Sequence, residues 1–226
     1  MQITYYGHSA FGLEIAGKHV LIDPFISPNE KAAHIDVGQI PADFILVTHG
    51  HQDHIADVVP IAQRTGATVV STFEMVNWFG QQGIEKAHPM NHGGSWQFDF
   101  GKLKMVNAIH SSSLPDGSYG GNPVGFVIQA EGKTFYYSGD TALTYDMKLI
   151  GEEFDLDFAF LCLGDNFTMG VQDAVKAADF IHCKDIIGMH FDTFGYIEID
   201  HAAAQKAFSE AGCQLALMEI GSSLER

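Results

Sequence analysis

The 226-residue sequence has few cysteines and no long apolar run. Its three cysteines, Cys162, Cys183 and Cys213, are an odd number without a Cys-x-x-Cys pair. This argues against a disulfide framework and fits a reducing compartment, so we interpret them as small buried apolar residues. No apolar stretch approaches the length of a membrane span, and Met1 to Tyr6 lack the basic and apolar regions of a signal peptide. We therefore expect a cytoplasmic protein.

Positive charge is also scarce. The chain has 12 Lys and Arg residues against 28 Asp and Glu residues, and its formal net charge is −16. Affinity for nucleic acids and for anionic membranes comes largely from Lys and Arg, so we expect neither as a partner. Bound divalent metals would restore positive potential locally, so an anionic small-molecule substrate is not excluded. A homo-oligomer also stays open, because nothing in the sequence fixes self-association.

The apolar residues, 46% of the chain, can bury one substantial core. With no clear linker, we expect one domain over residues 1–226, or two fused half-domains. Periodicity and turn signals predict strands at 3–6, 10–15, 19–23, 44–47, 68–71, 96–100, 103–109, 124–129, 134–138, 158–163, 186–189 and 215–220, and helices at 55–64, 74–82, 171–181 and 202–211. Two strand-rich halves, each with helices, predict an α/β (α+β) fold in which two mixed sheets face each other with helices outside.

One motif places four metal-binding side chains within six residues: His49, His51, Asp53 and His54. It directly follows the apolar run 44–47, which is typical of a strand buried on both faces. The motif thus lies at the carboxyl end of a strand, where open α/β sheets place their sites. Imidazole and carboxylate suit Zn, Mn or Fe, and no thiolate is offered. The alternative is a polar loop with incidental histidines.

Three further candidates, His110, Asp140 and His190, each follow a predicted strand. Taken alone, each is more often a structural histidine or a turn former. Together with the motif they give five imidazoles and two carboxylates, which suit two metals that share one carboxylate. Two metals about 3.5–4 Å apart can hold a bridging hydroxide, because they lower the pKa of bound water to about 7. No Ser or Cys nucleophile is then required. The chain accordingly has no Gly-x-Ser-x-Gly elbow.

This pattern, with the Ser138-Gly139-Asp140-Thr141 turn, resembles the metallo-β-lactamase superfamily over nearly the whole chain. The stretches 7–11 and 21–25 are similar to a metal-dependent hydrolase branch that includes ascorbate-6-phosphate lactonase-like proteins and N-acyl-phosphatidylethanolamine phospholipases, and most of all to its short bacterial and archaeal members. The resemblance implies a four-layer αββα sandwich with the site at one edge of the sheets. It implies a first metal on His49, His51 and His110, a second on Asp53, His54 and His190, and Asp140 between them.

The resemblance also implies roles for three residues near these metals. Asp53 would orient the attacking hydroxide as a catalytic residue, and Asp23 would fix a ligand imidazole through its other nitrogen. His8 would lie near the metals, where it could protonate the leaving group or bind an anion. Asp23 as a turn residue before Pro24, and His8 as a structural histidine in a Gly-His-Ser turn, remain alternatives.

Other polar stretches carry weaker signals. The Ser- and Gly-rich loop 111–125 leaves directly from His110, so it either borders the pocket or is a flexible connector; residues 191–194 could form another wall. Neither stretch identifies a substrate. We interpret His88 and His92 as loop residues, because the metal shell is already complete.

These observations lead to a primary hypothesis of a hydrolase with two divalent metals, zinc first and Mn, Fe or Ni as alternatives. It would cleave an ester, lactone or phosphodiester of a small molecule. A nuclease of the same superfamily is an alternative, but the chain lacks spare length and basic residues for a nucleic-acid-binding domain. A non-catalytic metal-dependent binding or sensing protein is the other alternative.

Overall fold

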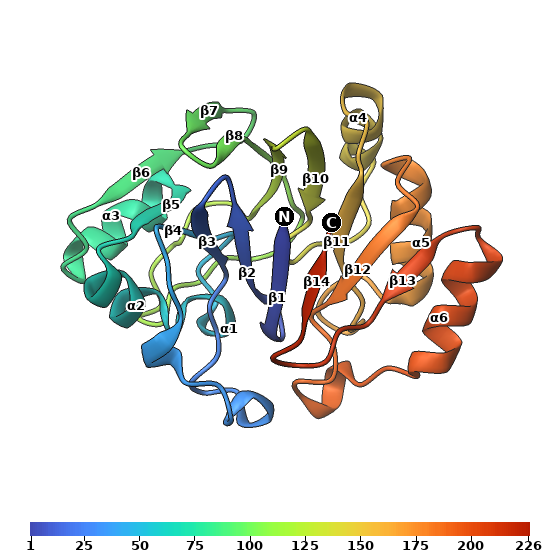
Figure 1. Ribbon diagram of the computed structural model, residues 1–226, viewed down its shortest axis with the longest axis horizontal. Helices are drawn as coiled ribbons and strands as arrows, with labels where there is room; N and C mark the ends of the chain where they lie inside the picture. Colours follow the sequence, from blue (N-terminus) through green and yellow to red (C-terminus); the bar gives the residue numbers. More distant parts are fainter.

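A computed structural model describes residues 1–226 as two seven-stranded β-sheets that face each other, with helices outside (Figure 1). The first sheet has the order β14-β1-β2-β3-β4-β5-β6 and the second β13-β12-β11-β10-β9-β8-β7. The strands are β1 (Gln2–Gly7), β2 (Ala10–Ile15), β3 (Lys18–Ile22), β4 (Phe44–Leu46), β5 (Thr68–Thr72), β6 (Ala87–Met90), β7 (Ser95–Phe98), β8 (Gly101–Asn107), β9 (Val124–Ala130), β10 (Lys133–Tyr137), β11 (Phe158–Cys162), β12 (Asp185–Met189), β13 (Gln214–Ala216) and β14 (Ser223–Glu225). The predicted αββα sandwich of two mixed sheets is confirmed.

Six α-helices and three 3-10 turns complete the chain. They are α1 (Gln52–Ile55), α2 (Val58–Thr65), α3 (Phe73–Gln81), α4 (Asp146–Glu153), α5 (Val171–Phe180), α6 (His201–Glu210), η1 (Glu30–Ala32), η2 (Val37–Gln39) and η3 (Gly195–Ile197). Helices α2 and α3 cover the first sheet, and α4, α5 and α6 lie beside the second (Figure 1). The predicted helix 55–64 corresponds to α2 and includes only the last residue of α1. Pro60 lies in the first turn of α2, where its missing N–H removes no helical hydrogen bond.

The buried strands of the first sheet divide their side chains between two cores. In β4, Leu46 faces the core between the sheets, whereas Ile45 faces the core beneath α2 and α3. Val70 and Val69 of β5 divide in the same way. Successive side chains of a strand point to opposite faces, so a strand covered on both faces must be apolar throughout. This explains why the segment before the metal motif is an unbroken apolar run.

Aromatic side chains join the two sheets. The ring of Phe11 on β2 lies 4.7 Å, centroid to centroid, from that of Phe160 on β11. Phe135 and Phe158 stack at 4.8 Å on the neighbouring strands of the second sheet. All four rings belong to the core of 41 buried residues shared by the two sheets. This shared core fixes the position of one sheet relative to the other.

The strand directions bring the predicted site residues to one edge. In the first sheet β1, β3 and β4 run the same way, because β2 is antiparallel to β1 and β3 while β4 is parallel to β3. In the second sheet β8, β10 and β12 share one direction for the same reason. The residues directly or shortly after these strands are His8, Asp23, the motif 49–54, His110, Asp140 and His190. One edge of the sandwich therefore receives every predicted site residue.

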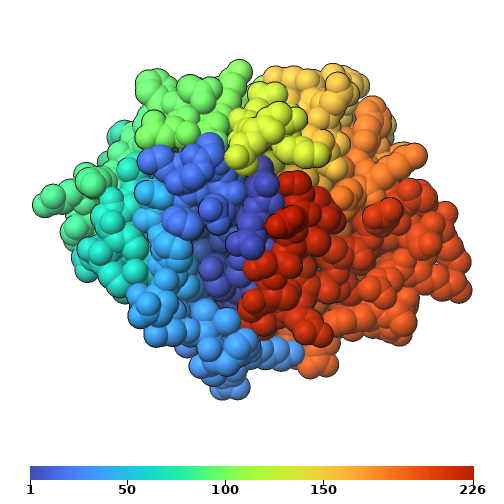
Figure 2. All heavy atoms as spheres, in the orientation of Figure 1, coloured from blue at the N-terminus to red at the C-terminus, as the bar shows by residue number.

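The two ends of the chain lie side by side. The last strand, β14, pairs antiparallel with β1, and the amino group of Met1 donates to the main-chain oxygen of Arg226 at 3.1 Å. The blue N-terminal and dark red C-terminal segments are adjacent on the molecular surface (Figure 2). None of the helices combines the length and apolar character needed to cross a bilayer.

Candidate metal centre

The motif 49–54 begins after β4 and ends in α1. His49 and His54 are buried, His51 is the residue before the helix, and Asp53 and His54 lie on it. The ring nitrogens of His49, His51 and His110 lie within 4.8 Å of one another, and Nε2 of His49 is 3.0 Å from Nδ1 of His51. The structure therefore brings together the three residues that the resemblance assigns to a first metal.

A second group surrounds Asp53. Side-chain atoms of Asp53, His54 and His190, together with His8, lie within 4.8 Å of one another. Nε2 of His190 is 3.8 Å and Nε2 of His54 is 4.0 Å from Oδ2 of Asp53. These are the three residues assigned to a second metal, with one additional histidine.

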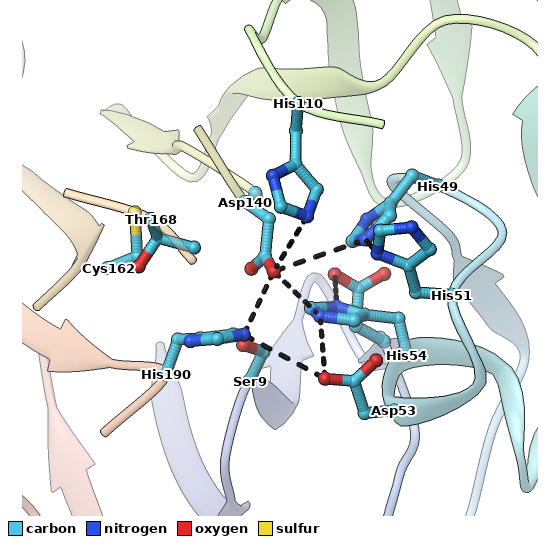
Figure 3. A network of polar contacts seen from close by, with 12 residues as sticks. Ser9, His49, His51, Asp53, His54, His110, Asp140, Cys162, Thr168 and His190 are labelled. Carbon is cyan, nitrogen blue, oxygen red and sulfur yellow. Dashed lines mark hydrogen bonds and ion pairs between the residues drawn. The ribbon is translucent and has the colours of Figure 1, made fainter. Parts of the chain in front are cut away.

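Asp140 lies between the two groups (Figure 3). Its Oδ2 atom is 2.9 Å from Nε2 of His190, 3.3 Å from that of His54, 3.6 Å from that of His110 and 4.0 Å from that of His49. The turn before it requires glycine, since Gly139 has a φ of 60° and a Cβ there would lie 2.7 Å from the main-chain oxygen of Val124. A single carboxylate oxygen thus reaches imidazoles of both groups.

The outer nitrogens of three motif histidines contact the surrounding chain, and their inner nitrogens face the other side chains of the cluster. The hydroxyl of Thr48 donates to Asp23 at 2.7 Å, and its oxygen therefore accepts from Nδ1 of His49 at 2.9 Å. Nε2 of His51 lies 3.1 Å from Oγ of Ser111, and Nδ1 of His54 lies 3.0 Å from Oδ2 of Asp23. Such contacts select the tautomer and ring orientation of metal-binding histidines.

The electrostatics of the cluster also fit cations. Burial first, and then the neighbouring imidazoles, lower the pKa of His49 well below its ordinary value, which keeps its ring neutral. Burial alone would raise the pKa of Asp140, but His190 and His54 hold it well below its ordinary value. Nε2 of His54 and Oδ1 of Asp140 are buried without a hydrogen-bond partner. Burial lowers the pKa of His54, but the charge of Asp140 and the hydrogen bonds with Asp140 and Asp23 outweigh it and raise this pKa well above its ordinary value. A cation bound by His54 would therefore replace a proton on its ring, as metal binding to imidazole requires.

Asp23 is fully buried and connects the motif to both sheets. It accepts hydrogen bonds from the main-chain N–H of Thr48 at 2.8 Å and the hydroxyl of Tyr137 at 3.2 Å, in addition to its contacts with the Thr48 hydroxyl and His54. Its contact with the outer nitrogen of His54 is the one that the resemblance implies. Neither Thr48 nor Tyr137 carried a sequence signal for this role.

We expect Asp23→Asn to weaken metal binding by about 10–100-fold, the usual cost of losing an outer partner of a ligand. The amide loses the charge that fixes the His54 imidazole, while the side-chain volume is kept. Competition with a fluorescent chelator measures the affinity. Asp43→Asn is the matched control, because Asp43 accepts only a main-chain N–H of His19 at 2.8 Å far from the cluster. Equal metal affinity in Asp23→Asn and the wild type would contradict this role.

His8 is buried behind Asp53, with only 1% of its surface exposed. Its Nε2 lies 3.0 Å from Oδ2 of Asp53 and its Nδ1 lies 2.8 Å from Oγ1 of Thr193. Burial and the nearby His190 lower the pKa of His8 to about 4 despite the hydrogen bond to Asp53, so a neutral ring can donate Nε2–H to the carboxylate. The structure gives His8 a contact with Asp53 and none with the cavity; its catalytic role stays a prediction.

The cavity at the cluster has a volume of about 290 Å³. It is lined by His51, Asp53, His110, Ser111, Asp140, Phe167, His190 and Phe194. Ser111 and Phe194 come from the two loops in which the sequence pointed to pocket walls. Phe167, in the loop after β11, is a wall residue that sequence reasoning missed, because a single phenylalanine in a polar loop has no periodic pattern.

The remaining histidines contact other parts of the chain. His88 lies in β6, contrary to the predicted loop, and its ring is 4.9 Å from that of Trp96. Nε2 of His92 lies 2.9 Å from the main-chain oxygen of Pro123, and Nε2 of His201 lies 2.6 Å from Oδ2 of Asp192. None of these residues belongs to a group of potential metal-binding side chains.

Comparison with known proteins identifies the family to which the chain belongs. The family model of the beta-lactamase superfamily domain matches residues 2–190. A UPF0173 metal-dependent hydrolase from Flavobacterium johnsoniae is 56% identical over 225 residues, and one from Christiangramia forsetii is 58% identical over 226, each covering 100% of both chains. The solved structure of Igni18, a metallo hydrolase from Ignicoccus hospitalis, is 32% identical with a TM-score of 0.88, covering 99% of this chain and 97% of that one. This chain therefore belongs to the metallo-β-lactamase superfamily and is one of its metal-dependent hydrolases.

Proposed function

We propose that the chain hydrolyses an ester, lactone or phosphodiester of a small molecule at a centre of two divalent cations. The observation that carries this proposal is the position of Asp140, whose Oδ2 lies 2.9–4.0 Å from imidazole nitrogens of both side-chain groups. His49, His51 and His110 would hold one cation, and Asp53, His54 and His190 the other, with Asp140 shared. Zinc is the first candidate, with Mn, Fe and Ni as alternatives.

Two cations there would lower the pKa of water to about 7 and polarise the substrate oxygen, which supplies a nucleophile without a serine or cysteine. Asp53 is suited to orient a nucleophile, because 27% of its side chain is exposed to the cavity and its Oδ2 is held by His8. Burial raises the pKa of Asp53, but the hydrogen bond from His8 and the charge of His54 outweigh it and keep the net pKa low. The carboxylate is therefore charged and fixed in place.

Metal content and turnover, measured on the same samples, test this proposal. Protein stripped by a chelator is reloaded separately with Zn, Mn, Fe(II) or Ni, and each sample is assayed with a panel of carboxylic esters, lactones and phosphodiesters. We expect activity to appear as the metal content approaches two ions per chain and to disappear on renewed chelation. Full activity at one ion per chain would contradict the two-metal centre. Ligand binding without turnover in a folded, fully loaded sample would favour a binding or sensing role instead.

A further inference from the structure

The outer wall of the cavity is aromatic. Phe167 and Phe194 line it from two different loops, and 53% and 39% of their surfaces are exposed. The ring of Phe167 lies 6.3 Å from that of Tyr196, and the ring of Phe194 lies 6.2 Å from that of Phe25. Each phenyl ring is thus supported on one side by a second aromatic ring, while part of its surface stays open to the cavity.

The backbone before Phe167 has an unusual conformation. Asp165 and Asn166 both have left-handed φ angles, of 59° and 49°. The turn is closed by main-chain hydrogen bonds from Asp165 to Met169 at 3.0 Å and from Thr168 to Asp165 at 3.2 Å. Left-handed residues other than glycine persist where the surrounding structure holds them, and they are frequent at ligand sites. These hydrogen bonds hold the turn from which Phe167 reaches the cavity wall.

No lysine or arginine lines the cavity, whereas two carboxylates do, Asp53 and Asp140. Lys31, on the neighbouring turn η1, donates to the main-chain oxygen of Asp192 and does not reach the cavity. Cations at the metal-binding groups would attract a negative charge at the reacting bond. No residue of the outer wall could form an ion pair with a second negative charge, farther from that bond. Placing an unpaired carboxylate or phosphate against phenyl rings is unfavourable because it loses hydration without compensation.

We propose that Phe167 and Phe194 select an ester, lactone or phosphodiester whose non-reacting part is uncharged and apolar, such as a short alkyl or aryl group. The cavity of about 290 Å³ lies at the lower end of the range of small-molecule sites and limits the size of that group. This inference rests on the proposed hydrolase function and narrows it, because compounds with a negative charge away from the reacting bond are disfavoured.

Two esters that differ by one group test the inference on the full-length, metal-loaded protein. 4-Nitrophenyl butyrate and 4-nitrophenyl hemisuccinate have the same leaving group and the same acyl length. The acyl chain of the butyrate ends in a methyl group, and that of the hemisuccinate ends in a carboxylate. After subtraction of the rate with metal-stripped protein, we expect kcat/KM to be at least about tenfold higher for the butyrate. An equal or higher kcat/KM for the hemisuccinate overturns the inference and leaves the proposed hydrolase function intact. If the folded, metal-loaded protein hydrolyses neither ester and no other ester, lactone or phosphodiester of the panel, both the inference and the proposed function are overturned.

Substitutions of Phe167 and Phe194 test whether these two residues bind the apolar part of the substrate. We expect Phe167→Ser and Phe194→Ser each to raise KM for the butyrate about fivefold with little change in kcat, since they remove apolar contact and leave the reacting groups in place. Trp96→Ser is the matched control, because Trp96 is equally exposed at 54% but lies on β7 outside the cavity. Phe167→Lys should shift the preference toward the hemisuccinate. Unchanged KM values in both serine variants, or an unchanged preference in Phe167→Lys with an unaltered melting temperature, would overturn the assignment.

Discussion

Asp53→Ala is expected to lower kcat/KM by about 10³-fold while the protein stays folded, on the scale of removing one preorganised electrostatic group from an active site. The carboxylate lies within 4.8 Å of the inner atoms of His54 and His190, is held by His8, and is the acidic residue of the motif that is partly open to the cavity. Its removal withdraws both a metal-binding oxygen and the group placed to orient a nucleophile. Steady-state kinetics at saturating metal measure the loss.

The fold should survive this change because the side chain lies at the rim of the core. Asp53 is in the first turn of α1, where losing a negative charge costs about 0.3–1 kcal/mol through the helix dipole. Gln52→Ala, an exposed neighbour on the same helix, is the matched control and should retain full activity. A metal-loaded Asp53→Ala protein with wild-type kinetics would rule out this role for Asp53.

The sequence predicts the fold well because the strands carry strong local patterns. Unbroken apolar runs such as 44–47 and 158–163 occur where a strand is covered on both faces, and the hairpin signal at 131–133 joins β9 and β10 as expected. The position of the site follows from the same patterns. Strands β4, β8, β10 and β12 end at one edge of the sandwich, so the motif 49–54 and the residues His110, Asp140 and His190 that follow these strands were predicted to lie together.

Segments without such patterns were missed. β6 contains His88 and Pro89 and suggests a loop, but proline is tolerated because β6 is the outermost strand of its sheet. β14 has only three residues, Ser223–Glu225, and exists because β1 offers it a free edge. Helix α4, with two buried residues, Met147 and Ile150, has too weak an amphipathic pattern to stand out. Tertiary contacts rather than local sequence specify these three elements.

The supporting residues of the site were predictable only in part. Asp23 was found through a resemblance, since nothing local distinguishes it from a turn residue before proline. Tyr137, whose hydroxyl contacts Asp23 from the other sheet at 3.2 Å, and Thr193, which contacts His8 at 2.8 Å, depend on packing between segments more than 100 residues apart. Contacts of this kind leave no periodic trace in the sequence.

Asp140→Ala is expected to have a larger effect than Asp53→Ala, because it affects both metal-binding groups. In the wild-type protein, cations that bind only the folded state stabilise it by about 2.7 kcal/mol when the free metal is 100 times the Kd, which raises the melting temperature. Without the shared carboxylate, the imidazoles of His190, His54, His110 and His49 lose the negative charge that lies 2.9–4.0 Å from them. We therefore expect fewer than two ions per chain and a loss of kcat/KM of about 10³–10⁴-fold.

The thermal shift distinguishes this role from a structural one. We expect metal to raise the melting temperature of Asp140→Ala by much less than that of the wild type. If the aspartate were merely structural, its loss would lower the melting temperatures of the metal-free and the metal-loaded protein equally. Asp146→Ala is the control. Asp146 lies on α4, accepts a hydrogen bond from the side-chain amide of Asn107 at 2.6 Å and does not belong to the cluster. It should keep the full metal-dependent shift and two ions per chain. If Asp140→Ala also bound two ions with wild-type affinity, the two groups would be independent sites and Asp140 would not join them.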